Sequence, residues 1–335
     1  IHRHPAGARP RTTGTGMNDE QTLALHVLQG LSAPQKALSS AWFYDDEGSR
    51  IFQKIMALPE YYLTRAEHDL LRERADEIAH WIDADRHALD LIELGSGDGE
   101  KTLTLCQTLH DHDVDCIYRP MDVSAHALAE LSQRFERHLP RMALEPMLAD
   151  YFEHWPATST QRRQVAMLLG SNLGNFDEDS AVALLRRIRA RLREDDVLLL
   201  GLDLVKDPHI IQAAYDDAQG VTAEFNLNLL RRLNRELGMN FDLEAFSHFA
   251  SYCPLQGVVR SFLVSRSRQV VSSAVLDREF RFAAGETIYT EQSQKYTEQG
   301  IDQLARASGF QSVRVITDER RWYALVVWRR TAEAG

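Results

Sequence analysis

Short apolar runs alternate with segments of helical periodicity through the middle of the chain. The apolar runs predict strands at residues 88–94, 116–122, 143–148, 165–170 and 197–205. Apolar residues that recur at helical spacing predict helices at residues 101–109, 125–138, 180–192 and 208–218. This alternation is typical of an α/β fold with a mostly parallel sheet and helices on both faces. Because crossover connections are right-handed, the carboxyl ends of the strands meet at one edge, where we expect a ligand next to the first strand.

The segments on either side of this alternation have different patterns. Residues 20–82 are helical in pattern and contain no obvious strand. Beyond residue 219 the alternation breaks, with a helical pattern at 221–237 and strand-like patterns at 258–271 and 279–282. We expect this inserted segment and the N-terminal helices to form a lid over the strand ends.

The end of the chain returns to the alternating pattern and completes a domain division. A helix is predicted at 297–308, and strands at 312–317 and 322–329 are expected to form a closing antiparallel hairpin. The predicted division is a tail at 1–16, an N-terminal helical part of a substrate domain at 17–82, a Rossmann-like core at 83–219 and 291–335, and an inserted part of the substrate domain at 220–290. The tail is rich in Arg, Pro, Gly and Thr and is expected to be disordered or vector-derived.

The composition narrows the class of protein. The chain has 335 residues, is 44% hydrophobic and carries a formal net charge of -11, which argues against non-specific binding to nucleic acid or anionic membranes. No apolar run approaches the roughly 18 residues of a membrane-spanning helix. The three cysteines, Cys106, Cys116 and Cys253, are scattered and are expected to be reduced thiols of a cytoplasmic protein. We expect a monomer whose partner is a small molecule.

A turn with three alternating glycines, Gly95, Gly97 and Gly99, follows the first predicted strand. Such a turn before a helix lets the backbone approach a nucleotide-like ligand closely. A dinucleotide fingerprint requires a further glycine at position 100, which is Glu100, and this disfavours a dehydrogenase. The E-x-G-x-G-x-G form is instead similar to motif I of class I S-adenosylmethionine-dependent methyltransferases.

Polar residues follow the next two predicted strands at the same edge. Asp122 suits a ribose, because a carboxylate can accept hydrogen bonds from both vicinal hydroxyls. The alternative is that Asp122 or Ser124 caps the helix that starts at residue 125. Asp150 and Tyr151 stand where a methyltransferase places an acidic residue on the adenine amino group and a side chain on the ring. The alternative for this pair is a surface loop.

Two further segments carry polar groups that suit a ligand. The turn at 170–176 holds two glycines and two asparagines, and a ligand-facing amide explains it better than helix capping, which Asp177 and Asp179 can supply. In an extended segment Glu291 and Ser293 project to one side, as a ligand site or a solvated edge. We interpret residues 110–113, rich in His and Asp, as a solvated loop and expect no metal site.

Taken together, these pieces resemble one family, the histidine-specific Nα-methyltransferases of the ergothioneine pathway, over residues 31–328. The motifs that carry the resemblance are Trp42-Phe43-Tyr44-Asp45, Leu58-Pro59-Glu60-Tyr61-Tyr62-x-Thr64-Arg65, Glu93-Leu94-Gly95-Ser96-Gly97, Leu169-Gly170-x-x-x-Gly174-Asn175, Asp203-Leu204-Val205-Lys206-Asp207, Tyr215-Asp216-Asp217, Phe225-Asn226-Leu227-Asn228 with Leu233-Asn234, and Glu291-x-Ser293-x-Lys295. The implied fold is a class I methyltransferase sheet, mostly parallel with a closing antiparallel hairpin, plus a smaller substrate-binding domain.

The resemblance implies a cofactor, S-adenosylmethionine, and a product, S-adenosylhomocysteine. The residues that it implies for the cofactor are Gly95, Gly97, Lys101, Asp122, Asp150 and Tyr151. It also implies that Asn175 and Tyr215 bind the carboxylate of an amino-acid substrate and that Tyr61 shapes its pocket.

The resemblance further implies which atoms react. Tyr44 would lie near the amino group, and Glu291 and Ser293 would hydrogen-bond an imidazole, fixing its tautomer. The free amine would displace the sulfonium methyl directly, up to three times, to give a trimethylated betaine. In-line positioning and desolvation would supply most of the rate, with no strong base required.

Two positions depart from the family pattern and keep the substrate open. Ser261 stands where a methionine would line the imidazole pocket, and Leu63 replaces a proline between Tyr62 and Thr64. The reading that Glu291 and Ser293 favour is Nα-methylation of histidine. The alternatives are the same reaction on another aromatic or modified amino acid, and a degenerate fold that binds ligand without catalysis.

Overall fold

The computed structural model describes residues 19–83 and 88–331, so the predicted tail at 1–16 lies outside the described residues. Contacts between residues divide the chain into two compact units. Unit 1 takes in the described part of Ile1–Tyr62 together with Asn175–Asp177 and Lys206–Gln294, and unit 2 takes in the described parts of Leu63–Gly174, Glu178–Val205 and Lys295–Gly335. The boundaries of these two units differ from the predicted domain boundaries at residues 82, 219 and 290. Each unit is described by itself.

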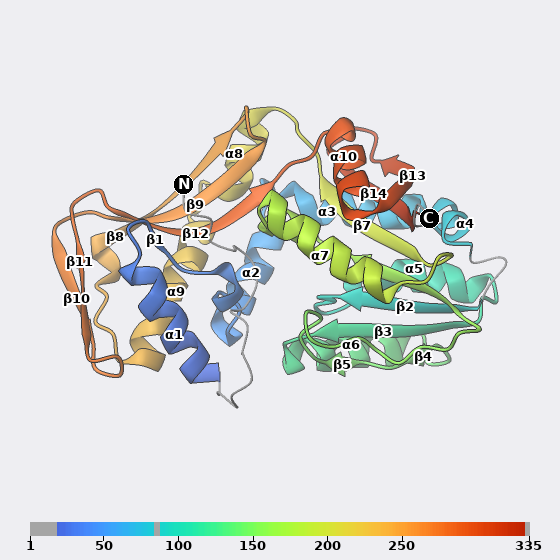
Figure 1. The fold of residues 1–335 in the computed structure, drawn as a ribbon, viewed down its shortest axis with the longest axis horizontal. Helices are drawn as coiled ribbons and strands as arrows, with labels where there is room; N and C mark the ends of the chain where they lie inside the picture. Colours follow the sequence, from blue (N-terminus) through green and yellow to red (C-terminus); the bar gives the residue numbers. More distant parts are fainter. Residues whose placement is uncertain (1–18, 84–87, 332–335) are drawn as a thin grey trace. The chain divides into compact units, whose positions relative to one another are not determined.

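Unit 2 is built on an eight-stranded sheet (Figure 1). Its order is β13 (Phe310–Thr317), β14 (Tyr323–Arg330), β7 (Val197–Asp203), β6 (Arg163–Leu168), β2 (Leu89–Leu94), β3 (Cys116–Asp122) and β4 (Ala143–Leu144), and β5 (Met147–Leu148) also pairs with β3. The strands from β7 to β5 pair in parallel, while β14 is antiparallel to both its neighbours. The predicted mostly parallel sheet with a closing antiparallel hairpin is therefore confirmed.

Helices cover both faces of this sheet. The described helices of unit 2 are α3 (Tyr62–Glu73, from its second residue), α4 (Ala75–Trp81), α5 (Glu100–Asp111), α6 (Ala125–His138), α7 (Glu178–Arg191) and α10 (Glu298–Ser308). Apolar residues of α3 to α6 form one buried cluster with alternate residues of β2, β6, β7 and β14. The intervening residues, such as Ile92, Ala166 and Leu198, are also buried and point to the other face, where α7 and α10 lie in Figure 1. A sheet buried on both faces explains why its central strands are mostly apolar.

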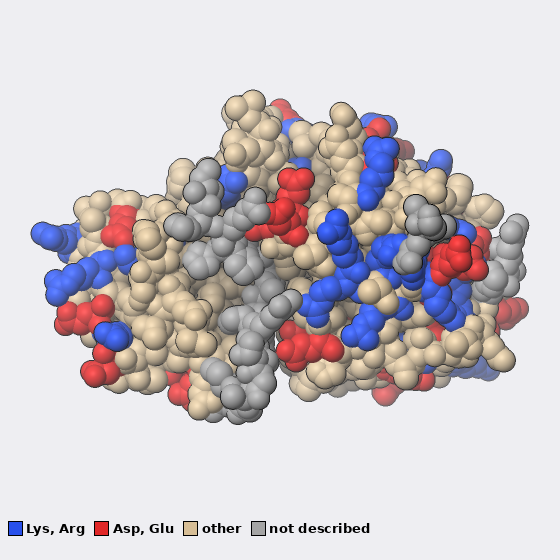
Figure 2. Space-filling model, viewed as in Figure 1, with Lys and Arg blue, Asp and Glu red and all other residues tan. Residues whose placement is uncertain are grey.

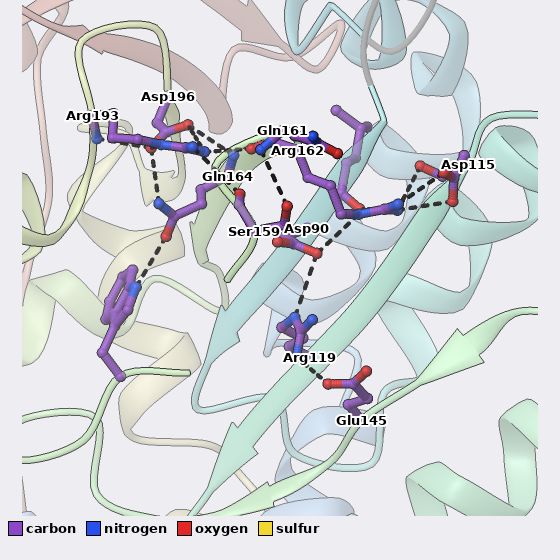
Figure 3. Close-up of polar contacts among 12 residues, drawn as sticks. Asp90, Asp115, Arg119, Glu145, Ser159, Gln161, Arg162, Gln164, Arg193 and Asp196 are labelled. Carbon is purple, nitrogen blue, oxygen red and sulfur yellow. Dashed lines mark hydrogen bonds and ion pairs between the residues drawn. The ribbon is translucent and has the colours of Figure 1, made fainter. Parts of the chain in front are cut away.

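Ion pairs and hydrogen bonds hold the amino ends of the unit 2 strands. Figure 3 shows Arg162 between Asp90 and Asp115, with Nε–Oδ1 and Nη1–Oδ2 distances of 3.2 and 2.8 Å. Asp196, which is 2% exposed, accepts hydrogen bonds from the backbone amide of Gln164 (2.8 Å) and from Arg193 (Figure 3). This polar network lies at the edge opposite the glycine turn, so its role is structural.

Arginines on α7 also serve the fold. Figure 2 shows basic side chains gathered over the part of unit 2 where α7 lies in Figure 1. Arg186 donates to the carbonyl of Ala307 (2.8 Å), and Arg189 donates to the carbonyls of Gly309 and Thr331 (2.9 and 3.1 Å). Arg186 and Arg189 therefore link α7 to the end of α10 and to the residue that follows β14.

Unit 1 has its own sheet and its own core. Its larger sheet has the order β1 (Lys36–Ala37), β12 (Thr287–Gln294), β9 (Val258–Ser265) and β8 (Phe246–Cys253), and a two-stranded ribbon pairs β10 (Gln269–Ser273) with β11 (Arg278–Phe282). Its described α-helices are α1 (Asp19–Ser32), α2 (Asp46–Ala57), α8 (Pro208–Tyr215) and α9 (Val221–Leu237). Apolar residues of α1, α2 and α9 cluster with Phe246, Leu263 and Ile288 on one face of the sheet. No helix among the described residues is long and apolar enough to span a membrane.

Three predicted elements are wrong in detail. The single strand at 258–271 is two strands, because Arg266, Ser267 and Arg268 are exposed and the chain turns there from one sheet into the other. The strand at 143–148 is also two, interrupted around Pro146, whose ring provides no N–H for a sheet. The N-terminal part does contain a strand, β1, which is too short to give a pattern. Strand β8 was not predicted, since its mixture of small, aromatic and polar residues hides its alternation.

Candidate active site

The glycine turn joins β2 to α5. Gly95 and Gly97 have φ angles of 75° and 58°, and their positions are tied to β3 by the bond from the Gly95 amide to the carbonyl of Met121 (2.8 Å). A side chain built on Gly97 would meet no atom within 4 Å, and one on Gly95 would come to 3.4 Å from Nδ2 of Asn172. Because the backbone is bare and the space beside Gly97 is open, this turn fits the approach of a nucleotide-like ligand.

Asp122 is fixed against this turn. Its Oδ2 accepts the Gly97 amide and its Oδ1 accepts the Ser124 amide, both at 2.9 Å. The cap of α6 is Ser124, whose hydroxyl accepts the amide of Ala127 at 3.2 Å. The structure thus leaves Asp122 at the turn, half-buried, with lone pairs that suit ribose hydroxyls.

Asp150 and Tyr151 lie at the same edge. Oδ1 of Asp150 accepts the amide of Phe152 (2.8 Å), and the Tyr151 ring, stacked on Phe152 at 4.8 Å between centroids, reaches to 4.0 Å from a side chain built on Gly95. Burial raises the pKa of the Tyr151 hydroxyl, so the ring is neutral. Val123 and Leu148, which follow or end neighbouring strands, are 49% and 63% exposed. An aromatic ring and exposed apolar side chains beside a bare backbone fit an adenine.

Lys101, in the first turn of α5, has a buried carboxylate as its partner. Its Nζ lies 2.6 Å from Oε2 of Glu67, a side chain that is 1% exposed. Burial by itself lowers the pKa of Lys101, but the adjacent Glu67 carboxylate outweighs it and the pKa is raised. Lys101 is therefore an ammonium at neutral pH. These features of unit 2 fit S-adenosylmethionine, which offers an adenine, a ribose and a charged methionine moiety.

In unit 1, a β-bulge in β12 determines which way the polar residues predicted to bind the substrate point. Glu291 pairs with Ser261 and Ser293 pairs with Val259 of β9, and the register shifts between Tyr289 and Glu291. Because cross-strand partners share a face, the bulge turns Glu291 and Ser293 to the side of Leu263 and Ile288, which α9 covers. Without the bulge, the residues on this side would be Thr290 and Gln292.

Tyrosines and phenylalanines adjoin this face. The Tyr215 hydroxyl, at the end of α8, donates to Oγ of Ser293 at 2.8 Å, and the rings of Tyr215 and Tyr61 lie 6.3 Å apart. Phe52 links Tyr61 to Tyr44, with ring distances of 6.2 and 5.5 Å. The structure thus brings Tyr44, Tyr61, Tyr215 and Ser293 into one continuous cluster.

Asn175 is connected to the same strand. It ends the 3-10 turn η2 (Asn172–Asn175), and the carbonyl of the next residue, Phe176, accepts Nε2 of Gln292 at 2.6 Å. This bond ties the predicted carboxylate-binding asparagine to β12.

Sequence reasoning missed several residues of these sites. Glu67 was missed, although a charge four residues after Leu63 and three before Leu70 interrupts an apolar helical stripe. Phe52 was assigned only to helical periodicity, and Phe225 to helical periodicity and a motif of the resemblance. No sequence pattern shows that both rings contact Tyr44. No sequence pattern singled out His248. The side-chain amide of Asn226 donates to its Nδ1, so its Nε2 carries the proton and donates to the carbonyl of Tyr215 at 2.9 Å. Burial lowers the pKa of His248.

Comparison with known proteins gives the family. The family model described as "Histidine-specific methyltransferase, SAM-dependent" matches residues 23–330. The chain belongs to this family. Over 293 residues it is 38% identical to the histidine N-alpha-methyltransferase of Mycobacterium tuberculosis (strain CDC 1551 / Oshkosh), which covers 88% of this chain and 90% of that protein. Over 288 residues it is 39% identical to the histidine N-alpha-methyltransferase of Mycolicibacterium smegmatis, covering 86% of this chain and 88% of that protein.

A longer fungal relative matches only in part. Ergothioneine biosynthesis protein 1 of Schizosaccharomyces pombe is 30% identical over 289 residues, which are 82% of this chain and 36% of that protein. Membership of the histidine-specific methyltransferase family confirms the predicted enzyme class: the chain is an S-adenosylmethionine-dependent N-methyltransferase. Among the described residues, no group of three or more His, Cys, Asp or Glu side chains is arranged to hold a metal ion.

Proposed function

We propose that the protein transfers methyl groups from S-adenosylmethionine to the α-amine of L-histidine, up to the trimethylated betaine. The observation that carries the proposal is the bulge of β12, which places Glu291 and Ser293 on the covered face of the sheet beside the Tyr215 hydroxyl. A neutral imidazole offers one N–H donor and one nitrogen acceptor. A carboxylate and a hydroxyl on one face satisfy both and reject side chains that lack these groups.

We assign further residues to the amino-acid backbone of the substrate. The amide of Asn175 would donate to the substrate carboxylate, and so would the Tyr215 hydroxyl once it turns away from Ser293, while Tyr61 would bound the pocket. Tyr44, which is 43% exposed, offers its hydroxyl to the amine. The two mycobacterial relatives are named histidine N-alpha-methyltransferases, and these names agree with the assignment.

The reaction requires the amine as a free base. When bound, the cofactor supplies an electrophilic methyl on a sulfonium. Before each transfer the substrate ammonium releases one proton to solvent. The protein's residues then orient the free amine and keep water away from the methyl, so that positioning gives most of the rate. The phenol oxygen of Tyr44 can accept an N–H of the amine, which leaves the nitrogen lone pair directed at the methyl and requires no strong base.

A panel of amino acids tests the proposal. The protein is incubated with isotopically labelled S-adenosylmethionine and each of the twenty amino acids, and the products are analysed by mass spectrometry. We expect methylated products from histidine only. Label on a different amino acid and none on histidine would refute the histidine assignment, and no transfer to any amino acid would favour a degenerate binding protein.

One observation favours a second candidate, Nα-methylation of another aromatic or modified amino acid. Ser261, which is 4% exposed, stands directly across from Glu291, and its side chain is smaller than the methionine of the family pattern, which favours a ring larger than an imidazole. Replacing it by the bulkier Ser261→Met distinguishes the two candidates. Under the second candidate this change abolishes turnover of the larger substrate, whereas under the first it leaves histidine turnover within a small factor of the unmodified protein.

A further inference from the structure

Glu67 is a charged residue on the buried stripe of α3. It is 1% exposed, and the neighbouring stripe residues Leu63, Leu70 and Leu71 are buried as well. Burying a carboxylate is costly unless its oxygens are hydrogen-bonded and its charge is paired. The contacts of Glu67 therefore indicate its role.

Three donors from three different elements meet the Glu67 carboxylate. Oε1 accepts the backbone amide of Gly170, in the turn after β6, at 2.7 Å, and the hydroxyl of Tyr323, on β14, also at 2.7 Å. Oε2 pairs with Nζ of Lys101, at the start of α5, at 2.6 Å. One carboxylate thus joins the lysine to a second turn of the cofactor edge.

Two glycines make room for this arrangement. A side chain built on Gly201, in the otherwise apolar strand β7, would lie 2.1 Å from Oε1 of Glu67. One built on Gly170 would lie 3.1 Å from Nζ of Lys101, and Gly170 has a φ of 72°. Both positions would be strained by any other residue, so the local backbone is shaped around the Glu67–Lys101 pair.

Lys101 retains capacity for a ligand. Its side chain is 25% exposed. An ammonium carries three N–H donors, and the contact with Glu67 uses one of them. On a flexible four-carbon side chain, an unheld ammonium would sample many positions, and fixing it removes that entropic cost before a ligand arrives.

We propose that Glu67 is a positioning residue for the methionine carboxylate of the cofactor, acting by holding the Lys101 ammonium and the Gly170 turn in place. This proposal rests on the assignment of Lys101 to the cofactor site. It requires Glu67 to touch no part of the ligand, because the side chain is 1% exposed and both of its oxygens are bound by groups of the protein. It also predicts that the effect of Glu67 is confined to the amino-acid end of the cofactor.

The test compares two nucleosides that differ at this end. S-adenosylhomocysteine carries the amino-acid moiety and 5′-methylthioadenosine lacks it, and calorimetry measures the affinity of each for the full chain. In Glu67→Gln the amide N–H groups oppose the Lys101 ammonium, so the lysine leaves its position. We expect affinity for S-adenosylhomocysteine to fall roughly tenfold, and that for 5′-methylthioadenosine to stay within about twofold.

Two further variants make the result decisive. Asp196→Asn neutralises another buried carboxylate of unit 2, at the opposite edge of the sheet, and is expected to lower the melting temperature without changing either affinity. Lys101→Met is expected to reproduce the selective loss seen for Glu67→Gln, and combining the two changes should add little.

The outcomes separate the two assignments. If Lys101→Met leaves S-adenosylhomocysteine affinity unchanged, the assignment of Lys101 is wrong and the role of Glu67 falls with it. If Lys101→Met weakens that affinity but Glu67→Gln does not, or if Glu67→Gln weakens both nucleosides equally, the positioning role alone is overturned.

Discussion

The bulge between Tyr289 and Glu291 determines which side chains of β12 face the covered side of the unit 1 sheet. It moves a carboxylate and a hydroxyl onto the face that carries Leu263 and Ile288 and that apolar residues of α9 cover. Under the proposed function, the Glu291 carboxylate accepts an imidazole N–H. The local strand irregularity would then be a source of substrate specificity.

Replacing Glu291 tests this point. Glu291→Ala is predicted to reduce kcat/KM for histidine by roughly tenfold to a hundredfold, because a charge-assisted hydrogen bond is worth about 1.5–3 kcal/mol. Affinity for S-adenosylhomocysteine, measured by calorimetry, should not change, since the cofactor residues belong to unit 2. If both fall together, Glu291 does not belong to the substrate pocket.

A second residue-scale prediction concerns pH. Glu93 is 1% exposed and accepts hydrogen bonds from the hydroxyls of Thr102 (2.8 Å) and Tyr118. Burial raises the pKa of Glu93 from 4.5 to about 7, and Tyr118 and Lys101 oppose this shift only in part. The folded state therefore binds this proton more tightly than the unfolded state does. The contribution of Glu93 to stability is present below the unfolded pKa and is lost as pH rises from about 4.5 to about 7.

The matched variant is Glu93→Gln, which keeps the shape and the acceptor but does not ionise. Chemical denaturation across this pH range should show the unmodified protein losing stability with rising pH relative to Glu93→Gln. Parallel stability curves for the two proteins would contradict the assigned pKa.

At the scale of elements, the amino edge of the unit 2 sheet depends on Asp196. This side chain binds the start of β6 through the Gln164 amide and the loop before β7 through Arg193. Asp196→Ala leaves these buried donors unsatisfied and is predicted to lower the free energy of unfolding by about 1–3 kcal/mol. The neighbouring exposed Asp195→Ala should change it by no more than about 0.5 kcal/mol. Denaturant melts of both variants check this, and equal effects would show that Asp196 has no special role.

The sequence predicted the elements of unit 2 better than those of unit 1, for a physical reason. Strands such as β2 and β7 are buried on both faces, so they are mostly apolar, with the buried Asp90 and Glu93 as the exceptions in β2. Strand β8 carries Phe249 outward and Ala250 inward, with Ser247 and His248 making mixed contacts, so its pattern is weak. Breaks at Pro146 and at Arg266 to Arg268 depend on which strand the chain pairs with next, and periodicity does not encode pairing.

At the scale of the whole molecule, each unit has its own hydrophobic core, and ligands should stabilise the protein by mass action. S-adenosylhomocysteine at 100 times its dissociation constant is predicted to add about 2.7 kcal/mol to the free energy of unfolding of the state that binds it. Thermal melts at increasing ligand concentration measure this. A melting temperature that does not depend on ligand would contradict binding to the folded protein.

The candidate sites were predictable to the extent that turn chemistry marks them. The glycine turn, Asp122 and the Asn-rich turn at 170–176 stand out because they follow strands that end at one edge of the sheet, although Gly, Asp and Asn are also the ordinary residues of turns and caps. The roles of Glu291, Ser293 and Tyr215 came from family resemblance and stay proposals. Glu67, His248 and the bulge of β12 needed the structure, because buried polar contacts and register shifts join residues far apart in the chain.

The position of the transferred methyl tests the central claim most directly. Histidine is incubated with the protein and S-adenosylmethionine labelled with ¹³C at the methyl, and the products are examined by NMR. We predict that all label appears on the α-nitrogen, through mono- and dimethyl species to the trimethylated betaine. Label on an imidazole nitrogen, or histidine recovered without label, would contradict the account.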